Sequence, residues 1–173
     1  ALQNHLTALR EKRARLDRLI GNVQKSILAM KGETEMTDEE KFEGFKEKLI
    51  LDNEQKYGGE IREKYGDEAV DRSNAKLKNM TKEQYGELEA LTQELNRTLK
   101  AAFEQGDPGS ELAQKACALH KKWLSFYWDH YSKEAHRGVA QMYVDDPRFT
   151  AYYDAVAPGC AVFLRDAVRI FCA

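Results

Sequence analysis

The stretch from His136 to Asp154, HRGVAQMYVDDPRFTAYYD, combines a basic pair, clustered aromatic side chains and a helix boundary. Within it, Asp145-Asp146-Pro147 predicts that one helix ends near Val144 and that the next begins at Pro147. The Asp146 side chain can accept hydrogen bonds from the first amides of the new helix, and proline suits the first helical position. A second aromatic run lies just upstream and contains Trp123, Phe126, Tyr127, Trp128 and Tyr131. Together the two runs hold more flat, polar-tipped side chains than an ordinary core needs, which indicates a binding function.

The composition is that of a soluble globular protein. The chain has 173 residues, of which 32% are charged and 42% hydrophobic, enough for one well-buried domain with an appendage. No apolar run reaches the length of a bilayer span, and the first residues show no signal-peptide pattern. The chain has only three cysteines, an odd number that does not build a disulfide framework: Cys117, Cys160 and Cys172. We therefore expect a cytoplasmic protein with no membrane partner.

Charge is unevenly distributed along the chain. Residues 1–32 carry seven Lys and Arg against two acids, whereas residues 33–71 carry fourteen acids against six bases. Nucleic-acid binding requires a basic face that can contact phosphates. Any such face is therefore confined to the first helix.

Residues 1–32 carry a heptad pattern. Apolar residues recur there at alternating steps of four and three, which is typical of a coiled coil. The predicted dimerisation residues are Leu9, Leu16, Ile20, Val23 and Ile27. Arg13 stands in the same seam and would weaken or specify the pairing. We expect a homodimer through residues 1–32, the alternative being a surface helix that lies on its own domain. Because the pattern starts without a capping residue, we also expect a segment upstream.

Residues 33–80 form an acidic segment with few apolar residues. Thr37 to Glu40 has the pattern of a capping box and predicts a helix start. Gly58-Gly59 and Gly66 then interrupt the helical pattern. We expect short helices of low local stability here, ordered only when a ligand is bound.

Residues 81–173 have clearer helical signals. A second capping box, Thr81 to Gln84, begins an amphipathic helix that Gly106 ends, and Ser110 caps the next one. That helix either breaks near Ser132 or continues to Val144. Pro158 predicts the start of a last helix. No stretch alternates with a period of two, so the sequence predicts an all-α protein.

Several short motifs carry a resemblance to a known family. They are Phe42-Glu43-Gly44-Phe45, Arg62-Glu63-Lys64-Tyr65-Gly66-Asp67, Tyr85 after Thr81-Lys82-Glu83, His136-Arg137-Gly138 with Met142-Tyr143-Val144, and Asp146-Pro147-Arg148-Phe149-Thr150. Residues 42–173 resemble the TipAS-type effector-recognition domain, the C-terminal half of a branch of MerR-family transcription activators. Residues 1–32 resemble the dimerisation helix that follows the DNA-binding head in MerR regulators.

The resemblance implies a long coiled-coil dimerisation helix followed by a globin-like helical ligand-binding domain. The implied divisions are a dimerisation helix over 1–32, a mobile acidic lid over 33–80 and an effector-binding domain over 81–173. The family senses thiopeptide antibiotics such as thiostrepton, or other bulky polycyclic or peptidic compounds. The segment that corresponds to residues 42–80 closes over the drug, so Phe45, Tyr57 and Tyr65 are candidate lid residues. Promoter DNA would be bound only through a winged-helix head, which this chain lacks.

The candidate ligand-binding residues are aromatic, imidazole or thioether side chains that can stack on a planar ligand and orient it with a few hydrogen bonds. They are His120, Trp123, Tyr127, Tyr131, His136, Met142, Tyr143, Phe149 and Phe163. The same helical spacing is also typical of a packed core. Thiostrepton-sensing relatives carry a drug-capturing cysteine a little before the HRG motif, and Tyr131 occupies that position here. This departure weighs against covalent capture and against a thiopeptide preference.

Other chemistry is less well supported. Cys117 and His120 lie three residues apart, but no second tight pair completes a zinc site, so no metal and no cofactor are predicted. A haem would require a deep apolar slot at His120 or His136, and the tyrosine hydroxyls argue against it. Cys160 follows Gly159 at a predicted helix start, where the helix dipole can lower a thiol pKa, although a core position is the simpler interpretation. We expect Arg137 to pair with Asp145 or Asp154. No catalytic motif is present, so we do not expect an enzyme.

Overall fold

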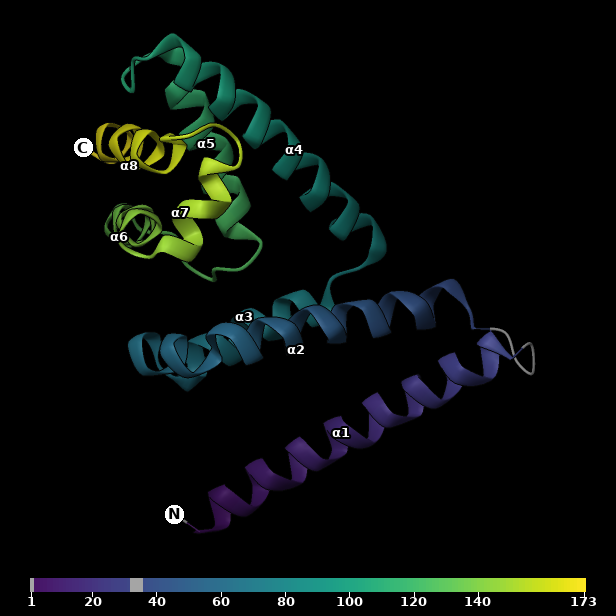
Figure 1. Cartoon of the computed structure of the whole chain (residues 1–173). Coiled ribbons are helices and arrows are strands. Elements are labelled where there is room, and N and C mark those ends of the chain that lie inside the picture. The colour runs from purple at the N-terminus through teal and green to yellow at the C-terminus, as the bar shows by residue number, and fades with distance from the viewer. Residues whose placement is uncertain (1, 32–35) are drawn as a thin grey trace. The chain divides into compact units, whose positions relative to one another are not determined.

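The computed structural model describes residues 2–31 and 36–173, and its regular structure in these ranges is α-helical, which confirms the all-α prediction (Figure 1). The chain divides into two compact units, residues 1–79 and residues 80–173, which we call the N-terminal and C-terminal units. The first contains α1 (Leu2–Met30), α2 (Asp38–Tyr65) and α3 (Asp67–Asn79). The second contains α4 (Lys82–Gln105), α5 (Glu111–Ser125), α6 (Lys133–Asp145), α7 (Pro147–Asp154) and α8 (Cys160–Phe171). None of these helices is long and apolar enough to span a bilayer.

Helix α1 keeps its apolar seam exposed. The five seam residues each expose between 47% and 58% of their surface: Leu9, Leu16, Ile20, Val23 and Ile27. Polar side chains join α1 to α2, where Asn22 Nδ2 donates to Glu47 Oε2 at 3.0 Å and Lys25 pairs with Glu40. The seam is therefore uncovered within one chain, and its pairing with a second copy stays a prediction.

Helix α2 is longer than the sequence indicated. It begins at the predicted capping box of Thr37 and Glu40, continues through Gly58-Gly59, and ends only at Gly66, whose φ is +81°. A methyl group at Gly58 would lie 2.6 Å from Glu54 Oε2, so the glycine leaves room for that carboxylate to fold along the helix. The expectation of short helices broken at Gly58-Gly59 was wrong, because this glycine accommodates a side chain rather than a turn.

Arg62 connects α2 to α3. Its guanidinium donates to Glu54 at 2.8 Å, to Asp67 at 3.0 Å and to Asp71 at 2.7 Å. Asn74 Nδ2 of α3 donates to the same Glu54 carboxylate. Bidentate and charge-assisted hydrogen bonds of this kind are the stronger ones. A polar clamp therefore holds this helix pair, which buries few large apolar side chains.

We expect Arg62→Met to loosen α3 because it keeps the length of the side chain and removes its five donors. The free energy of local opening of α3 should fall by roughly 1–2 kcal/mol. This is less than fully buried charged hydrogen bonds would contribute, because the clamp is partly exposed to solvent. Native-state hydrogen exchange of the α3 amides measures this loss. Arg72→Met removes an Arg–Glu pair that is mostly exposed and serves as the control. Equal exchange rates in the two variants would contradict the clamp.

In the C-terminal unit, α4 and α5 form an antiparallel hairpin, and α8 packs against each of the other four helices (Figure 1). Gly106 ends α4 at a φ of +81°, and the Ser110 hydroxyl accepts from Ala113 N to begin α5, as predicted. Fully buried side chains from several helices fill the centre, among them Leu99, Cys117, Leu164 and Val168. This core positions the aromatic runs.

The boundaries that the sequence left open are settled in this unit. Helix α5 ends at Ser125, so the expectation that it runs through Tyr131 to Ser132 or to Val144 was wrong. A new helix begins after Ser132, whose hydroxyl accepts from Ala135 N at 3.0 Å. Asp146 and Pro147 begin α7 as predicted, with Arg148 N donating to the Asp146 carboxylate. Helix α8 begins at Cys160 rather than at Pro158.

Candidate ligand-binding site

Two histidines from different helices meet inside the C-terminal unit. His120 on α5 and His136 on α6 are both fully buried, and His120 Nδ1 lies 2.8 Å from His136 Nε2, within hydrogen-bonding distance. Burial lowers the pKa of His120 to about 3 and that of His136 to about 4. The neighbouring imidazole adds to the first shift, and the Lys121 ammonium adds to the second. Both rings are therefore neutral at physiological pH.

Tyrosines extend the pair at both ends. The Tyr131 hydroxyl lies 3.0 Å from His136 Nδ1, and Cys172 Sγ lies 3.8 Å from the same nitrogen. At the other end, His120 Nε2 is 3.3 Å from the Tyr143 hydroxyl and 3.4 Å from the Tyr153 hydroxyl. Both ring nitrogens of each histidine thus have hydrogen-bonding partners, and a metal or haem ligand at either ring would have to break one of these contacts.

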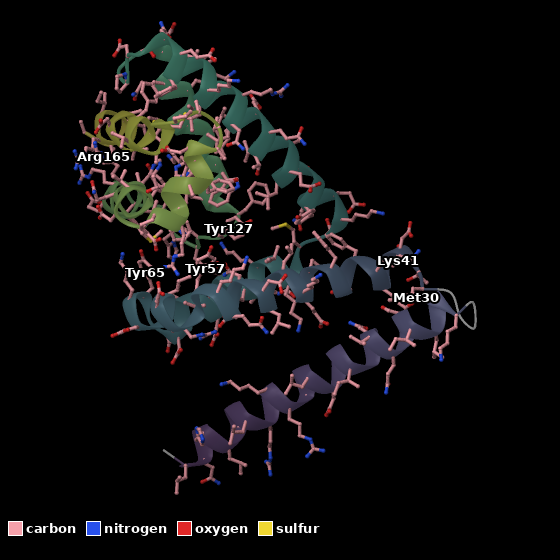
Figure 2. All side chains as sticks on the ribbon, in the orientation of Figure 1. Met30, Lys41, Tyr57, Tyr65, Tyr127 and Arg165 are labelled. Carbon is pink, nitrogen blue, oxygen red and sulfur yellow. The ribbon has the colours of Figure 1, made fainter. Side chains whose placement is uncertain are left out.

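Trp123 lies directly against the histidine pair. Its ring is nearly parallel to that of His120, with 5.9 Å between the centroids and 9° between the planes. Its indole nitrogen donates to Thr92 Oγ1 of α4 at 3.1 Å, and that hydroxyl donates to Leu88 O. The Tyr127 ring, labelled in Figure 2, follows at 5.0 Å from Trp123. The stack and the hydrogen bond together fix the orientation of this indole.

A second aromatic group lies around α6 and α7. Tyr143 and Tyr153 are buried with 4.6 Å between their ring centroids, and the half-buried Phe149 lies 5.9 Å from Tyr143. Thr150 Oγ1 donates to the Tyr143 carbonyl at 2.8 Å, which ties α7 to the end of α6. We call the rings of both groups, with the histidine pair, the aromatic cluster: His120, Trp123, Tyr127, Tyr131, His136, Tyr143, Phe149 and Tyr153.

The structure thus brings together most of the residues predicted for the site. Trp123, Tyr127, Tyr131, Met142 and Phe149 are half-buried. His120, His136 and Tyr143 lie beneath them as buried support. Phe163 is also buried, where it packs edge-on against Phe103 with 5.6 Å between centroids. The predicted lid residues Phe45, Tyr57 and Tyr65 all belong to α2, in the other unit.

Sequence reasoning missed three members of this network. Thr92 interrupts the apolar face of α4, and a polar residue at such a position was a usable signal. Tyr153 stood in the quoted stretch but was not selected among its neighbours. Cys172 gave no signal, because only the packing of α8 brings it to His136.

Two predicted interactions are corrected. Arg137 contacts neither Asp145 nor Asp154; it pairs with Glu134 at 3.5 Å and donates to the Cys172 carbonyl at 3.1 Å. The Asp154 carboxylate instead accepts from Ala161 N at the start of α8, and the Asp145 carboxylate accepts from Gln141.

The Cys160 thiol has the core position that was the simpler interpretation, and not the properties of a reactive thiol at a helix start. It is completely buried, and burial together with the Asp154 carboxylate raises its pKa instead of lowering it. Cys160 therefore has the properties of a core residue. Among residues 2–31 and 36–173, no three His, Cys, Asp or Glu side chains gather as a metal site would require.

The fold and the aromatic cluster define an all-α domain in which imidazole and aromatic side chains are joined across helices. The TipAS antibiotic-recognition domain family matches residues 57–171, and this chain belongs to that family. The resemblance inferred from the motifs is thereby confirmed.

Relatives support the same assignment. The chain is 34% identical over 171 residues to the HTH-type transcriptional activator TipA of Streptomyces coelicolor, covering 92% of this chain and 65% of TipA. It is 26% identical over 172 residues to the HTH-type transcriptional activator mta of Bacillus subtilis, covering 99% of this chain and 66% of mta. This chain thus spans about two thirds of the length of these relatives.

A solved structure is also similar. TipAS from Streptomyces lividans, in complex with nosiheptide and described as part of a thiopeptide antibiotic multidrug resistance system, matches with a TM-score of 0.60 and 31% identity. The match covers 80% of this chain and 95% of TipAS.

Proposed function

We propose that this chain is the drug-sensing effector domain of a cytoplasmic MerR-type transcription activator. It would bind a bulky polycyclic or thiopeptide-like antibiotic on the aromatic cluster and signal to a DNA-binding head outside this chain. The observation that carries the proposal is the cluster itself, found in a family whose member TipAS is in complex with nosiheptide. No catalytic role is proposed.

The half-buried rings supply the binding surface. Trp123, Tyr127 and Phe149 offer flat faces that stack on heteroaromatic ligand rings at little cost in conformational entropy. The buried part of the cluster supports this surface, because His120 stacks beneath Trp123 and the Thr92 hydroxyl fixes its indole. Preorganised rings lose little freedom on binding, which favours affinity.

Signalling would use the N-terminal unit. The exposed seam of α1 pairs two chains as a coiled coil, so a change in one effector domain alters the geometry of the dimer. Helix α2 carries the lid residues Phe45, Tyr57 and Tyr65, and its closing over the drug would bias that geometry. The drug must then bind the closed form better than the open one. Promoter DNA would be contacted by the winged-helix head.

An alternative is a stand-alone protein that sequesters the drug without contacting DNA. The match to TipAS favours this alternative. That chain is in complex with nosiheptide, and 95% of it is covered by 80% of this chain, so the drug-binding part of the relative corresponds to this chain alone. A gene that encodes a winged-helix segment directly upstream of residue 1 would support the activator, and its absence would support sequestration.

Nosiheptide provides the first test. Titration into nitrogen-labelled protein is expected to shift the Trp123 indole signal and to sharpen signals from residues 42–80. Mass spectrometry of the mixture is expected to show no covalent adduct, because Tyr131 stands at the family's capture position. A panel of polycyclic antibiotics is tested in parallel. If no compound shifts Trp123 or Tyr143, the drug-sensing function is wrong for this chain.

A further inference from the structure

The histidine pair carries one hydrogen between its rings. His120 Nδ1 and His136 Nε2 are 2.8 Å apart and fully buried, so one nitrogen donates and the other accepts. A neutral imidazole has a single N–H. If His136 donates through Nε2, its Nδ1 must accept, and the N–H of His120 must then be on Nε2. If His120 donates through Nδ1, both rings carry their hydrogen on Nδ1.

We propose that His120 and His136 form a two-state hydrogen-bond relay, in which the two rings always share the same tautomer and switch together. In the change from Nδ1–H to Nε2–H, one proton crosses from His120 to His136, one leaves His136 Nδ1 through Tyr131, and one enters His120 Nε2 through Tyr143 or Tyr153, so that each ring stays neutral. Mixed tautomers would oppose two N–H groups or two lone pairs across 2.8 Å in the core, where unpaired polar groups are costly. The relay links the half-buried Tyr131 at one end to Tyr143 and Tyr153 at the other.

The ends of the relay respond in opposite senses. When both hydrogens are on Nδ1, His136 donates to the Tyr131 oxygen, and His120 Nε2 accepts from a hydroxyl of Tyr143 or Tyr153. When both are on Nε2, Tyr131 donates to His136, and His120 donates to one of these tyrosines. Any group that fixes the Tyr131 hydroxyl as donor or acceptor therefore favours one state of the relay, acting beside the Cys172 thiol, which lies 3.6 Å from that hydroxyl and 3.8 Å from His136 Nδ1.

This gives the ligand a way to act on the core, a step that rests on the proposed function. A ligand carbonyl or ring nitrogen that accepts from Tyr131 favours the state in which His136 donates to the tyrosine oxygen. A ligand N–H that donates to Tyr131 favours the reverse state. The hydrogen bonds of Tyr143 on α6 and Tyr153 on α7 change with it, so the site distinguishes ligands by acceptor or donor character.

The first test needs no ligand. In protein labelled with ¹⁵N-histidine, long-range nitrogen–proton correlation spectra at neutral pH show which ring nitrogen carries the hydrogen. We expect His120 and His136 to have the same tautomer, or the same average of the two. His130 is exposed and provides a reference for solvent-exposed imidazole. Opposite tautomers in the pair, or a positively charged ring at neutral pH, would overturn the relay.

The second test removes one hydroxyl. Tyr131→Phe is expected to shift the ring nitrogen signals of both histidines together, although Tyr131 is bonded only to His136 of the pair. Tyr153→Phe, at the far end, should likewise move both rings. Tyr152→Phe is the matched control, since its half-exposed ring contacts Tyr153 without joining the chain of hydrogen bonds. Shifts confined to the nearer histidine, or none in either variant, would contradict the proposal.

Nosiheptide is then added to the wild-type protein. Binding accompanied by a joint shift of both rings supports the coupling between ligand and relay, and binding with unchanged rings refutes it. If nosiheptide does not bind, the proposed drug-sensing function is weakened. The shared tautomer of the free protein is measured separately and would still stand.

Discussion

Acidification from pH 7 to pH 5 is expected to lower the free energy of unfolding of the C-terminal unit by about 4 kcal/mol through His120 and His136. Their folded-state pKa values of about 3 and about 4 lie below the ordinary value of 6.5. Below pH 6.5 the unfolded chain therefore binds two protons that the folded chain excludes. The stability from neutral burial is complete above pH 6.5 and decreases as the pH falls, down to about 4 for His136 and about 3 for His120.

The groups facing the pair explain why no counter-charge compensates. The neighbours are hydroxyls, a thiol and aromatic rings, together with the Lys121 ammonium, and none of them carries a negative charge. Because whole domains are stable by only about 5–15 kcal/mol, this loss is large enough to approach acid unfolding.

Urea unfolding at pH 7 and at pH 5 measures the effect. In His136→Gln, which keeps hydrogen-bonding groups and removes one titrating ring, we expect the dependence on pH to fall by roughly half. In His130→Asn, an exposed position, the dependence should match the wild type. A wild-type pH dependence in His136→Gln would show that this histidine is not responsible.

Replacing Trp123 and Tyr127 together by alanine is expected to weaken drug binding by at least about 100-fold, because stacked aromatic anchors contribute most to such sites. Both side chains are half-buried, and the end of α5 remains anchored by the buried Leu119 and Leu124. Helicity measured by circular dichroism should therefore stay close to that of the wild type. Calorimetric titration with nosiheptide, or with whichever compound of the panel binds, gives the affinity.

The control for this double variant is Val162→Ala with Ile170→Ala. Both residues lie on α8, where Val162 exposes 42% and Ile170 exposes 51% of its surface. The same helix carries Arg165, which is labelled in Figure 2 and pairs with Asp166. The control removes exposed apolar surface elsewhere, so its affinity should be unchanged. If the Trp123 and Tyr127 variant also binds normally, the ligand site lies elsewhere.

The sequence predicted helix ends correctly where they depend on interactions between residues close together in the chain. The capping box at Thr37, the glycine at 106 and the Asp146-Pro147 boundary each act within a few residues, and each predicted helix end is present. Gly58 was misinterpreted as a helix break. A glycine is needed there because the Glu54 side chain lies against the helix at that position, and a residue pattern does not show such a contact. Helix α8 begins two residues after Pro158, with Gly159 as its N-cap, and the distant Asp154 carboxylate accepts from Ala161 N in its first turn.

Contacts between distant residues were not predictable in the same way. The sequence placed His120, Trp123 and Tyr127 on one helical face, but it gave no reason to join Trp123 to Thr92, 31 positions earlier. It likewise left Arg137 beside the wrong carboxylates, since its partner Cys172 O is brought near only by α8.

The amino-acid sequence by itself determined the helical class, the helix starts marked by capping residues, the heptad seam of α1 and the family to which the chain belongs. These depend on periodicity and on short motifs, which act through neighbours in the chain. Only the tertiary structure decided that two histidines 16 residues apart share one hydrogen bond, and that Tyr131 and Cys172 meet at its end. Such contacts depend on how the helices pack, and packing is set by the shape of the whole core.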